Sequence, residues 1–334
     1  MAEVLGTDRA GIARAAALLR AGGLVAFPTE TVYGLGAPAL WAEAVAKVFA
    51  AKGRPRFDPV IVHVAEPGEA ERLWQEVPAL ARALMERFWP GPLTLVLPKR
   101  EIVPDIVTAG LPTVAVRMPA HPVALALIRE AGMPIAAPSA NRFGRLSPTH
   151  HEAVLEQLGE AIDAVIAGGP TPVGIESTVI SLAENPPRLL RPGGTPIEAL
   201  RELVPDLRLD PPRGPSASPG TLPQHYRPAT PLFLWEPGPP MGGEALERHR
   251  CGFLAFRKPW EGFAQVEVLS ERGDLVEAAA RFFALLRKLD RAGLAAIVAE
   301  PVPEVGLGLA IMDRLRRASS GRARLDETRV WIAH

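Results

Sequence analysis

The sequence predicts an α/β protein with a large sheet domain, residues 1–203, and a second, smaller Rossmann-like α/β domain, residues 232–334. From residue 10 to about residue 200, segments with helix-like apolar periodicity alternate with short β-rich runs. A segment with eight prolines in residues 204–231 then interrupts the pattern, as a stiff linker would. Beyond this linker the alternation of strand-like and helix-like segments resumes.

The individual elements follow from periodicity and from residues that end helices. A first helix is predicted for residues 12–20, because Gly22 and Gly23 stop it, and a second for residues 41–51. Several strand candidates are apolar on both faces, which indicates a central sheet covered by helices. In the large domain the strand candidates are 24–27, 59–64, 93–97, 113–117, 135–137, 164–166 and 178–182. In the small domain they are 232–235, 252–256 and 295–299, with helices at 275–289 and 307–317.

Composition excludes several classes of protein. A chain of 334 residues with 48% hydrophobic side chains can bury a core, so it is neither disordered nor fibrous. Lys and Arg total 37, as do Asp and Glu, and both halves are balanced, so no global field attracts nucleic acid or anionic lipid. The single cysteine, Cys251, excludes an internal disulfide and is typical of a reducing compartment. Without a secretory signal or a long apolar stretch, we expect a cytoplasmic protein that does not enter a membrane.

Polar residues gather directly after several predicted strands. Residues 28–36 combine two threonines, a glutamate and a tyrosine after one strand, and residues 138–141 place a serine and an asparagine after another. Because ligands bind at strand ends in α/β sheets, these groups predict a composite pocket. Lys52 and Arg54 suit a polyanion, since Lys supplies a point charge and Arg a bidentate fork. Each group alone is also explained by a turn, by a solvated helix end or, for His63, by a core imidazole.

These motifs resemble the signature blocks of the YrdC-like threonylcarbamoyl-AMP synthases in their two-domain form. The blocks occur in the family's order over residues 5–205: residues 28–36, Lys52-Gly53-Arg54-Pro55 with residues 59–64, Ser139-Ala140-Asn141 and Arg191-Pro192-Gly193. Ser218-Pro219-Gly220 with His225-Tyr226 resembles the linker of two-domain members, and residues 306–315 resemble their C-terminal domain. The resemblance implies a twisted, mixed YrdC-like sheet covered by helices.

The resemblance also implies an activity. The family's enzymes are nucleotidyltransferases that make L-threonylcarbamoyl-adenylate from L-threonine, bicarbonate and ATP and release pyrophosphate. A downstream transferase complex then moves the threonylcarbamoyl group onto an adenosine beside the tRNA anticodon. We expect Mg²⁺ to enter with ATP, because the sequence shows no aspartate cluster for a metal held by the protein alone. The balanced charge does not favour tight direct binding of tRNA.

The same resemblance assigns roles to individual residues. It implies that the catalytic residues are Lys52, Arg54, Ser139 and Asn141. ATP would also contact Asp58, Thr113, Ser147 and Arg191, and His225 or Tyr226 of the linker would close over it as a lid. Threonine would be held by Thr31, His63, Arg117, Ala137 and Ser177, with Arg117 on its carboxylate.

Two positions depart from the family's pattern. Asp58 stands where the family usually has asparagine, so it cannot donate a hydrogen bond and adds negative charge near a triphosphate. In the linker, Thr221-Leu222-Pro223-Gln224 stands where an aromatic and a basic residue are expected.

Two alternative functions remain open on the sequence. An RNA-binding module would need clustered cations. The chain has one dense cluster of arginines, at the end of a predicted helix, and a solvated helix terminus also explains it. Its members are Arg314, Arg316, Arg317, Arg322 and Arg324. A relative that binds nucleotide without making the adenylate is disfavoured by the intact motifs around Lys52 and Ser139.

The segment His150-His151-Glu152 is a poor metal-binding motif if it is helical, because its two histidines would then point about 100° apart. It is predicted to begin a helix that runs to Gly159.

Overall fold

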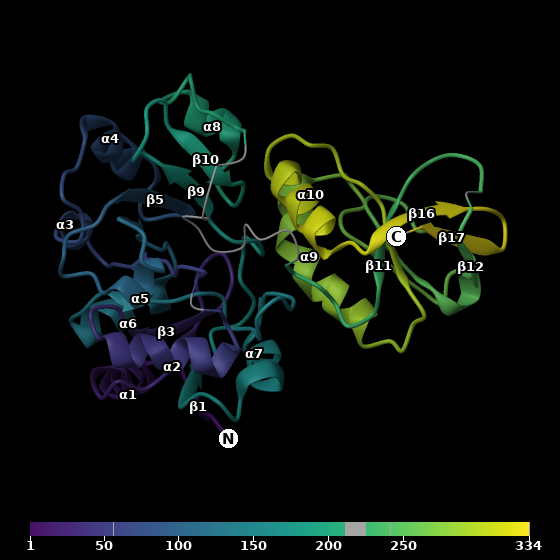
Figure 1. The fold of residues 1–334 in the computed structure, drawn as a ribbon. Helices are drawn as coiled ribbons and strands as arrows, with labels where there is room; N and C mark the ends of the chain where they lie inside the picture. Colours follow the sequence, from purple (N-terminus) through teal and green to yellow (C-terminus); the bar gives the residue numbers. More distant parts are fainter. Residues whose placement is uncertain (56, 211–224, 241, 334) are drawn as a thin grey trace. The chain divides into compact units, whose positions relative to one another are not determined.

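The structure is a computed structural model that describes residues 1–55, 57–210, 225–240 and 242–333. The chain divides into two compact units (Figure 1). Unit 1 comprises residues 1–143 and 147–222, and unit 2 comprises residues 144–146 and 223–334. The first part of the predicted linker, to residue 210, packs in unit 1, where the Arg208 amide donates to the Pro187 carbonyl. The linker motif Ser218-Pro219-Gly220 lies outside the described residues.

Unit 1 contains a ten-stranded mixed sheet in the order β1-β8-β2-β3-β7-β4-β6-β5-β9-β10. The pairs β1/β8, β2/β8, β4/β6 and β5/β9 are parallel, and the other neighbouring pairs with an assigned register are antiparallel. This arrangement confirms the mixed sheet. The strands are β1 (Glu3–Leu5), β2 (Val25–Phe27), β3 (Gly34–Pro38), β4 (Val62–His63), β5 (Leu93–Pro98), β6 (Thr113–Arg117), β7 (Ile135–Ala136), β8 (Ala164–Ile166), β9 (Thr178–Ser181) and β10 (Arg188–Arg191).

Helices cover both faces of this sheet because its central strands are apolar on both sides. In β2, Val25 and Phe27 join a core cluster with residues of α1 and α6, whereas Ala26 joins a second cluster with residues of α2 and α7. Helix α1 begins at Arg9, directly after Asp8, whose side chain caps the helix by accepting from the Gly11 amide. The helices of unit 1 are α1 (Arg9–Arg20), α2 (Ala42–Lys52), α3 (Pro67–Glu71), α4 (Ala79–Phe88), α5 (Asp105–Thr108), α6 (Pro122–Ala131), α7 (His151–Leu158) and α8 (Ile197–Arg201).

Two sequence-based predictions about this sheet are wrong in detail. Residues 34–38 form strand β3, where no strand was predicted, because Gly34 and Gly36 are also typical of a turn. Gly36 is needed there because a Cβ atom would lie 2.8 Å from Phe27 Cε1 on the neighbouring strand. Conversely, the predicted strand at residues 59–64 pairs only over Val62–His63, because the backbone before it leaves the ladder to bind Arg54.

Unit 2 contains a seven-stranded sheet in the order β12-β17-β16-β11-β15-β13-β14. The neighbouring pairs from β16 through β11, β15 and β13 to β14 are parallel, and β17 pairs antiparallel with β16 and β12. Helices α9 (Leu275–Asp290) and α10 (Leu307–Ala318) pack side by side against this sheet (Figure 1). The remaining elements are β11 (Leu232–Trp235), β12 (Glu244–Glu247), the 3₁₀ helix η1 (Arg248–Arg250), β13 (Gly252–Ala255), β14 (Gln265–Val268), β15 (Ile297–Ala299), β16 (Gly321–Leu325) and β17 (Arg329–Ala333).

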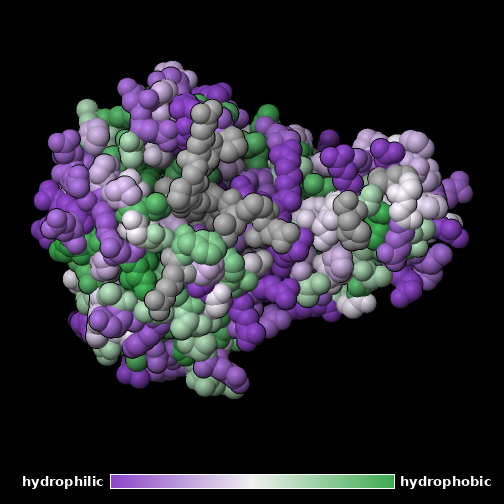
Figure 2. All heavy atoms as spheres, in the orientation of Figure 1, coloured by the Kyte–Doolittle hydropathy of each residue, from purple (hydrophilic) through white to green (hydrophobic). Residues whose placement is uncertain are grey.

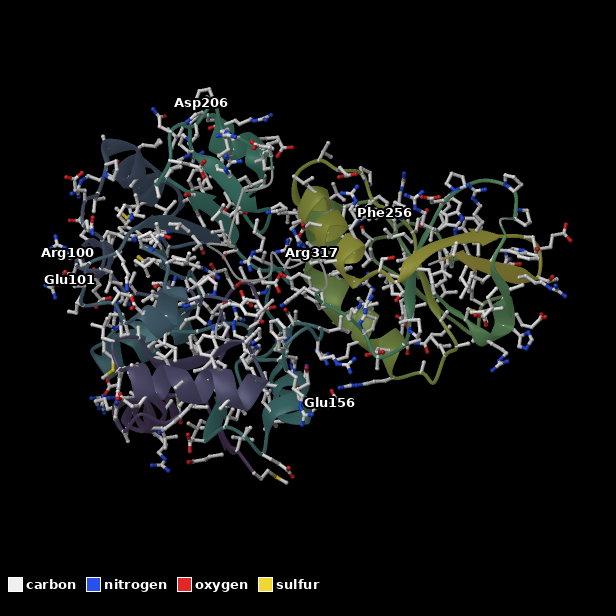
Figure 3. The ribbon with its side chains drawn as sticks, viewed as in Figure 1. Arg100, Glu101, Glu156, Asp206, Phe256 and Arg317 are labelled. Atoms are coloured by element: carbon white, nitrogen blue, oxygen red, sulfur yellow. The ribbon has the colours of Figure 1, made fainter. Side chains whose placement is uncertain are left out.

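The C-terminal arginine cluster is not a free cationic surface. Arg314 is fully buried and pairs with Asp313 at 3.0 Å, so the prediction of a solvated helix end is wrong for this residue. Arg317, on α10 (Figure 3), pairs with the same carboxylate at 2.9 Å. Arg316 pairs with Glu304, and Arg322 pairs with Glu236. These carboxylates neutralise the charge that an RNA-binding surface would need.

The surface mixes polar and apolar residues. Figure 2 shows hydrophilic residues over much of the visible face of each unit, with hydrophobic residues between them. In the part of the chain that the structure describes, none of the helices has the length and apolar character needed to cross a bilayer.

Candidate active site

The loop after β2 forms one wall of the candidate site. Thr29 and Thr31 are almost completely buried, and their Oγ1 atoms lie 2.8 Å apart. The Thr29 hydroxyl also donates to the Val32 carbonyl at 2.7 Å, which fixes the turn. The Tyr33 hydroxyl donates to the Gly169 carbonyl at 2.8 Å. Hydrogen bonds thus hold the predicted polar motif inside unit 1.

Arg117, at the end of β6, connects this loop to the sheet. Its Nη1 donates to Thr31 Oγ1 at 2.9 Å, and its Nη2 lies 2.6 Å from Oε1 of Glu30. Both side chains of this ion pair are less than a tenth exposed. The structure therefore brings together Thr31 and Arg117, two of the residues predicted to bind the substrate threonine. The glutamate of the loop motif, Glu30, was given no role in the site. Its position next to Thr31 in the sequence could have indicated one.

His63 lies beside Arg117, because β4 and β6 pair in parallel with these two residues in register. Burial, followed by the charge of Arg117, lowers the pKa of His63 to about 3. The imidazole is therefore neutral at physiological pH. Its Nδ1 is buried and makes no hydrogen bond within the described residues, so a ligand could use it.

A second polar group forms where α2 ends. Lys52 is the last residue of this helix, and its Nζ donates to the carbonyls of Ser139 and Asn141. Burial, followed by the charge of Arg54, lowers the pKa of Lys52 well below its usual value. Gly53 then takes a left-handed conformation, with φ of 62°, and turns the chain so that Arg54 also points inward. The structure thus brings together the predicted catalytic residues.

Asp58 is paired within this group. Its Oδ2 lies 2.8 Å from Arg54 Nη2, and both side chains are 3% exposed or less. Burial raises the pKa of Asp58, whereas the charges of Arg54, Lys52 and Arg191 oppose that rise. The carboxylate therefore occupies a place among three cations, and a phosphate oxygen would compete for the same partners.

Arg191 and Ser177 connect β10 to the start of β9. Arg191 Nη2 donates to the Ser177 carbonyl at 2.9 Å and to its hydroxyl at 3.2 Å. The Ser177 hydroxyl in turn lies 2.8 Å from Thr94 Oγ1. Ser147 donates to the Glu176 carboxylate, next in sequence to Ser177. Thr94 is a supporting residue that the sequence motifs did not indicate, whereas Glu176 lay in the polar segment before β9 but was given no role.

Ala137 and Thr113, two further residues with a predicted substrate contact, lie at the ends of strands. Ala137 is buried directly after β7, and its amide donates to the Ile61 carbonyl at 2.9 Å. Thr113 begins β6, at the opposite end of the strand from Arg117, so the structure does not bring it together with the threonine-binding group. Its contact with ATP stays a prediction.

His225 and Tyr226 belong to unit 2. The His225 amide donates to the Arg317 carbonyl at 3.3 Å. The Tyr226 ring packs between Phe283, at 5.7 Å between centroids, and the guanidinium of Arg314, at 5.3 Å. Their contact with ATP stays a prediction, since these interactions all lie within unit 2.

Comparison with known proteins agrees with this geometry. A family model described as "Telomere recombination", of the Sua5, YciO and YrdC proteins, matches residues 17–193. A model described as the C-terminal domain of threonylcarbamoyl-AMP synthase matches residues 195–320. A threonylcarbamoyl-AMP synthase from Pyrococcus abyssi is 47% identical over 318 residues, which cover 92% of this chain and 94% of that protein. The chain belongs to the threonylcarbamoyl-AMP synthase family.

Further relatives of this family cover nearly the whole chain. A threonylcarbamoyl-AMP synthase from Bacillus subtilis is 45% identical over 334 residues, which cover 96% of each protein. The crystal structure of P. abyssi Sua5 complexed with L-threonine matches with a TM-score of 0.87 and 42% identity, covering 98% of this chain and 100% of that one. The chain is therefore an enzyme of threonylcarbamoyl-AMP synthesis, a transferase of tRNA modification, and a binding module without activity is not favoured.

Proposed function

We propose that this enzyme binds L-threonine beside Arg117 and ATP beside Lys52, and joins them through bicarbonate to form L-threonylcarbamoyl-AMP and pyrophosphate. This reaction makes it a nucleotidyltransferase. The observation that carries the proposal is the presence of two buried cationic groups in unit 1. One contains Arg117 with Glu30, and the other contains Lys52 and Arg54 with Asp58.

The first group suits an amino acid. Arg117 can present its guanidinium to the threonine carboxylate, and the Thr31 hydroxyl can bond the substrate's polar atoms. Neutral His63 can accept or donate one hydrogen bond without adding charge. Ala137 and Ser177 complete the proposed pocket, in which a methyl-sized contact separates threonine from serine by about 1–3 kcal/mol.

The second group suits a triphosphate. In the proposed reaction the threonine amine adds to bicarbonate with loss of water, and the carbamate oxygen then attacks the α-phosphorus of ATP. The bond from that phosphorus to the bridging oxygen breaks, and pyrophosphate leaves with the electron pair. Lys52, Arg54 and Arg191 stabilise the negative charge that builds on these oxygens, while Ser139, Asn141 and Ser147 position the nucleotide.

Mg²⁺ is proposed to enter as the ATP complex, where it neutralises phosphate oxygens. The group around Lys52 combines three cations with the single carboxylate of Asp58, a donor set that fits phosphate rather than a bare divalent ion.

We further propose that His225 or Tyr226 closes over ATP. The product then passes to a separate transferase complex that modifies tRNA in the cytoplasm, without tight binding of tRNA by this chain.

The test is a reconstituted synthesis. The purified full chain is incubated with ATP, Mg²⁺, bicarbonate and one amino acid at a time, while pyrophosphate is assayed and the acyl-adenylate is measured by mass spectrometry. We expect product with threonine that depends on bicarbonate, and much less product with serine.

Variants separate the proposal from a general loss of folding. Lys52→Ala and Arg54→Ala should each lower product formation by about a hundredfold or more, as removal of a charge-stabilising group does. Arg87→Ala removes an exposed arginine of α4 and should leave the rate unchanged. Binding of ATP without any adenylate would overturn the proposal in favour of a nucleotide-binding relative.

A further inference from the structure

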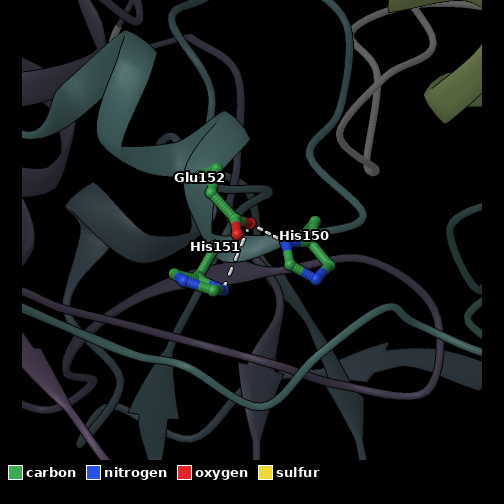
Figure 4. A group of neighbouring side chains, drawn as sticks. All are labelled: His150, His151 and Glu152. Carbon is green, nitrogen blue, oxygen red and sulfur yellow. Dashed lines mark ion pairs between the residues drawn. The ribbon is translucent and has the colours of Figure 1, made fainter.

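A group of metal-binding side chains lies at the start of α7, outside the residues assigned above. His150 is the N-cap residue of this helix, and His151 and Glu152 open its first turn. The ligand atoms of all three lie within 4.8 Å of one another (Figure 4). Among the residues that the structure describes, no other group of three histidine, cysteine or acidic side chains comes together in this way.

The backbone of His150 brings the two imidazoles together. Successive residues inside a helix point about 100° apart, which made this pair a poor metal-binding spacing. His150 is instead extended, with φ of −149° and ψ of 153°, and the helix begins one residue later. The two ring centroids consequently lie 4.8 Å apart, with the rings tilted by 34°. The prediction of a helix here is confirmed, whereas the poor spacing expected for two helical histidines does not apply, because His150 lies outside the helix.

One carboxylate oxygen faces both rings. Glu152 Oε2 contacts Nδ1 of His150 and lies 3.3 Å from Nδ1 of His151 (Figure 4). The latter nitrogen is buried and makes no hydrogen bond within the described residues. Glu152 also supplies negative charge at the positive end of the α7 dipole, which would otherwise repel a cation.

We propose that His150, His151 and Glu152 bind a divalent transition metal ion of the Zn²⁺ type. Imidazole nitrogens suit Zn²⁺, Ni²⁺ and Cu²⁺, whereas Mg²⁺ prefers oxygen ligands alone. Two histidines and one glutamate also form a known zinc donor set, which leaves a fourth position for water or another ligand.

The side chains have room to complete this geometry. Ligand atoms around a tetrahedral zinc ion lie about 3.3 Å apart, so the most widely separated of these atoms must approach by about 1.5 Å, whereas Glu152 Oε2 must move away from His150 Nδ1. The side chains of His150, His151 and Glu152 are 39%, 20% and 62% exposed, which lets them turn without disturbing the core.

The site is connected to the loop that carries Thr31. The Pro148 carbonyl accepts from the Tyr33 amide at 2.9 Å, and the Thr149 carbonyl accepts from the Thr171 amide at 3.0 Å. These two hydrogen bonds anchor the residues just before the proposed ion site to other segments of unit 1. Because the proposal rests on the geometry of its own residues, it does not depend on the synthase mechanism.

The test is a calorimetric titration of the full chain with Zn²⁺, after removal of metal by a chelator and in a buffer without phosphate or ATP. We expect one ion per chain and an affinity in the micromolar range. His151→Ala and Glu152→Gln should each weaken binding at least tenfold. His249→Ala removes an exposed histidine of unit 2 and should leave the affinity unchanged, and Mg²⁺ should give no saturable binding.

A thermal readout checks the same variants. Zn²⁺ should raise the Tm of the wild type and of His249→Ala, but not that of His151→Ala, while the circular dichroism of each metal-free variant shows whether it is folded. Saturable binding that is equally strong in wild type, His151→Ala and Glu152→Gln overturns the proposal. A wild-type chain that binds no Zn²⁺ overturns it as well.

Discussion

Asp58 lies inside the group of cations that we propose to bind ATP. Its carboxylate pairs with Arg54 at 2.8 Å, and its charge opposes that of a triphosphate. Asp58→Asn keeps the shape and removes the charge, so we expect the KM for ATP to fall roughly threefold to tenfold, equivalent to about 1 kcal/mol. Steady-state pyrophosphate assays measure this change, with Asp105→Asn, an exposed acid, as the control. An unchanged or higher KM would show that the ion pair with Arg54 supports ATP binding.

Glu30 is a buried positioning residue for Arg117. Removal of one partner from a buried ion pair leaves an uncompensated charge, so Glu30→Gln should lower the free energy of unfolding by about 3 kcal/mol and raise the KM for threonine. Glu66→Gln breaks an exposed pair with Arg129 and should cost less than about 1 kcal/mol. Urea denaturation and threonine kinetics together test this contrast. Equal effects of the two substitutions would refute the role of Glu30.

His63 makes stability depend on pH. Its pKa is about 3 in the folded chain, against 6.5 for the ordinary group, so below pH 6.5 the unfolded chain binds a proton that the folded chain does not. The stability that neutral His63 contributes is complete above pH 6.5 and is lost as the pH falls toward 3. Between pH 6.5 and pH 5 this loss is about 2 kcal/mol. In urea denaturation, wild type should therefore lose about that much more than His63→Gln between pH 7 and pH 5; matching losses would contradict the assignment.

At the level of elements, the turn after β10 approaches the start of β9 so closely that only glycine fits. A Cβ atom on Gly193 would lie 2.3 Å from the Glu176 carbonyl oxygen and 2.4 Å from the Thr178 nitrogen. This approach places Arg191 against Ser177. The contact between these two strands, rather than any property of the turn alone, therefore requires glycine at residue 193.

A glycine substitution tests this element. Gly193→Ala should lower the free energy of unfolding by about 3 kcal/mol or more, because backbone must move to admit the methyl group. Gly68→Ala, in α3, has no atom within 4 Å of the added Cβ and should be neutral or stabilising by up to about 1 kcal/mol. Chemical denaturation of both variants gives the comparison. If both alanines are tolerated equally well, the close approach does not restrict this position.

At the level of the whole molecule, each unit has a hydrophobic core of its own. In unit 1, Phe27 packs in the cluster between the sheet and helices α1 and α6. In unit 2, Phe253 packs with Phe233 and Val298 in a separate cluster. Units with separate cores can unfold as separate cooperative bodies.

Calorimetry can show this independence. Phe253→Ala should destabilise unit 2 by about 3–5 kcal/mol, and lower the Tm of one transition while the other stays in place. The reciprocal variant, Phe27→Ala, should shift the other transition. A single transition that moves as one in both variants would contradict the expectation.

The sequence alone determined the α/β fold class, because apolar periodicity is a local property of the chain, whereas the mixed sheet and the roles of the residues in the two polar groups were implied by the family resemblance. The motifs around Lys52 and Ser139 also identified the family, since they occur together in a fixed order. Local sequence patterns failed to predict a strand where the structure depends on a residue that is close in space but not in sequence. Strand β3 needs Gly36 because Phe27 lies against it.

The tertiary structure decided which charges meet. Arg314 looked like a solvated cation, but packing buries it beside Asp313 and over the Tyr226 ring. Glu30 became the partner of Arg117 only when β6 met the loop after β2, and His150 joined His151 only because the helix starts between them. Pairing energies and burial depend on distances between residues far apart in sequence or on backbone angles, and neither can be obtained from residue order.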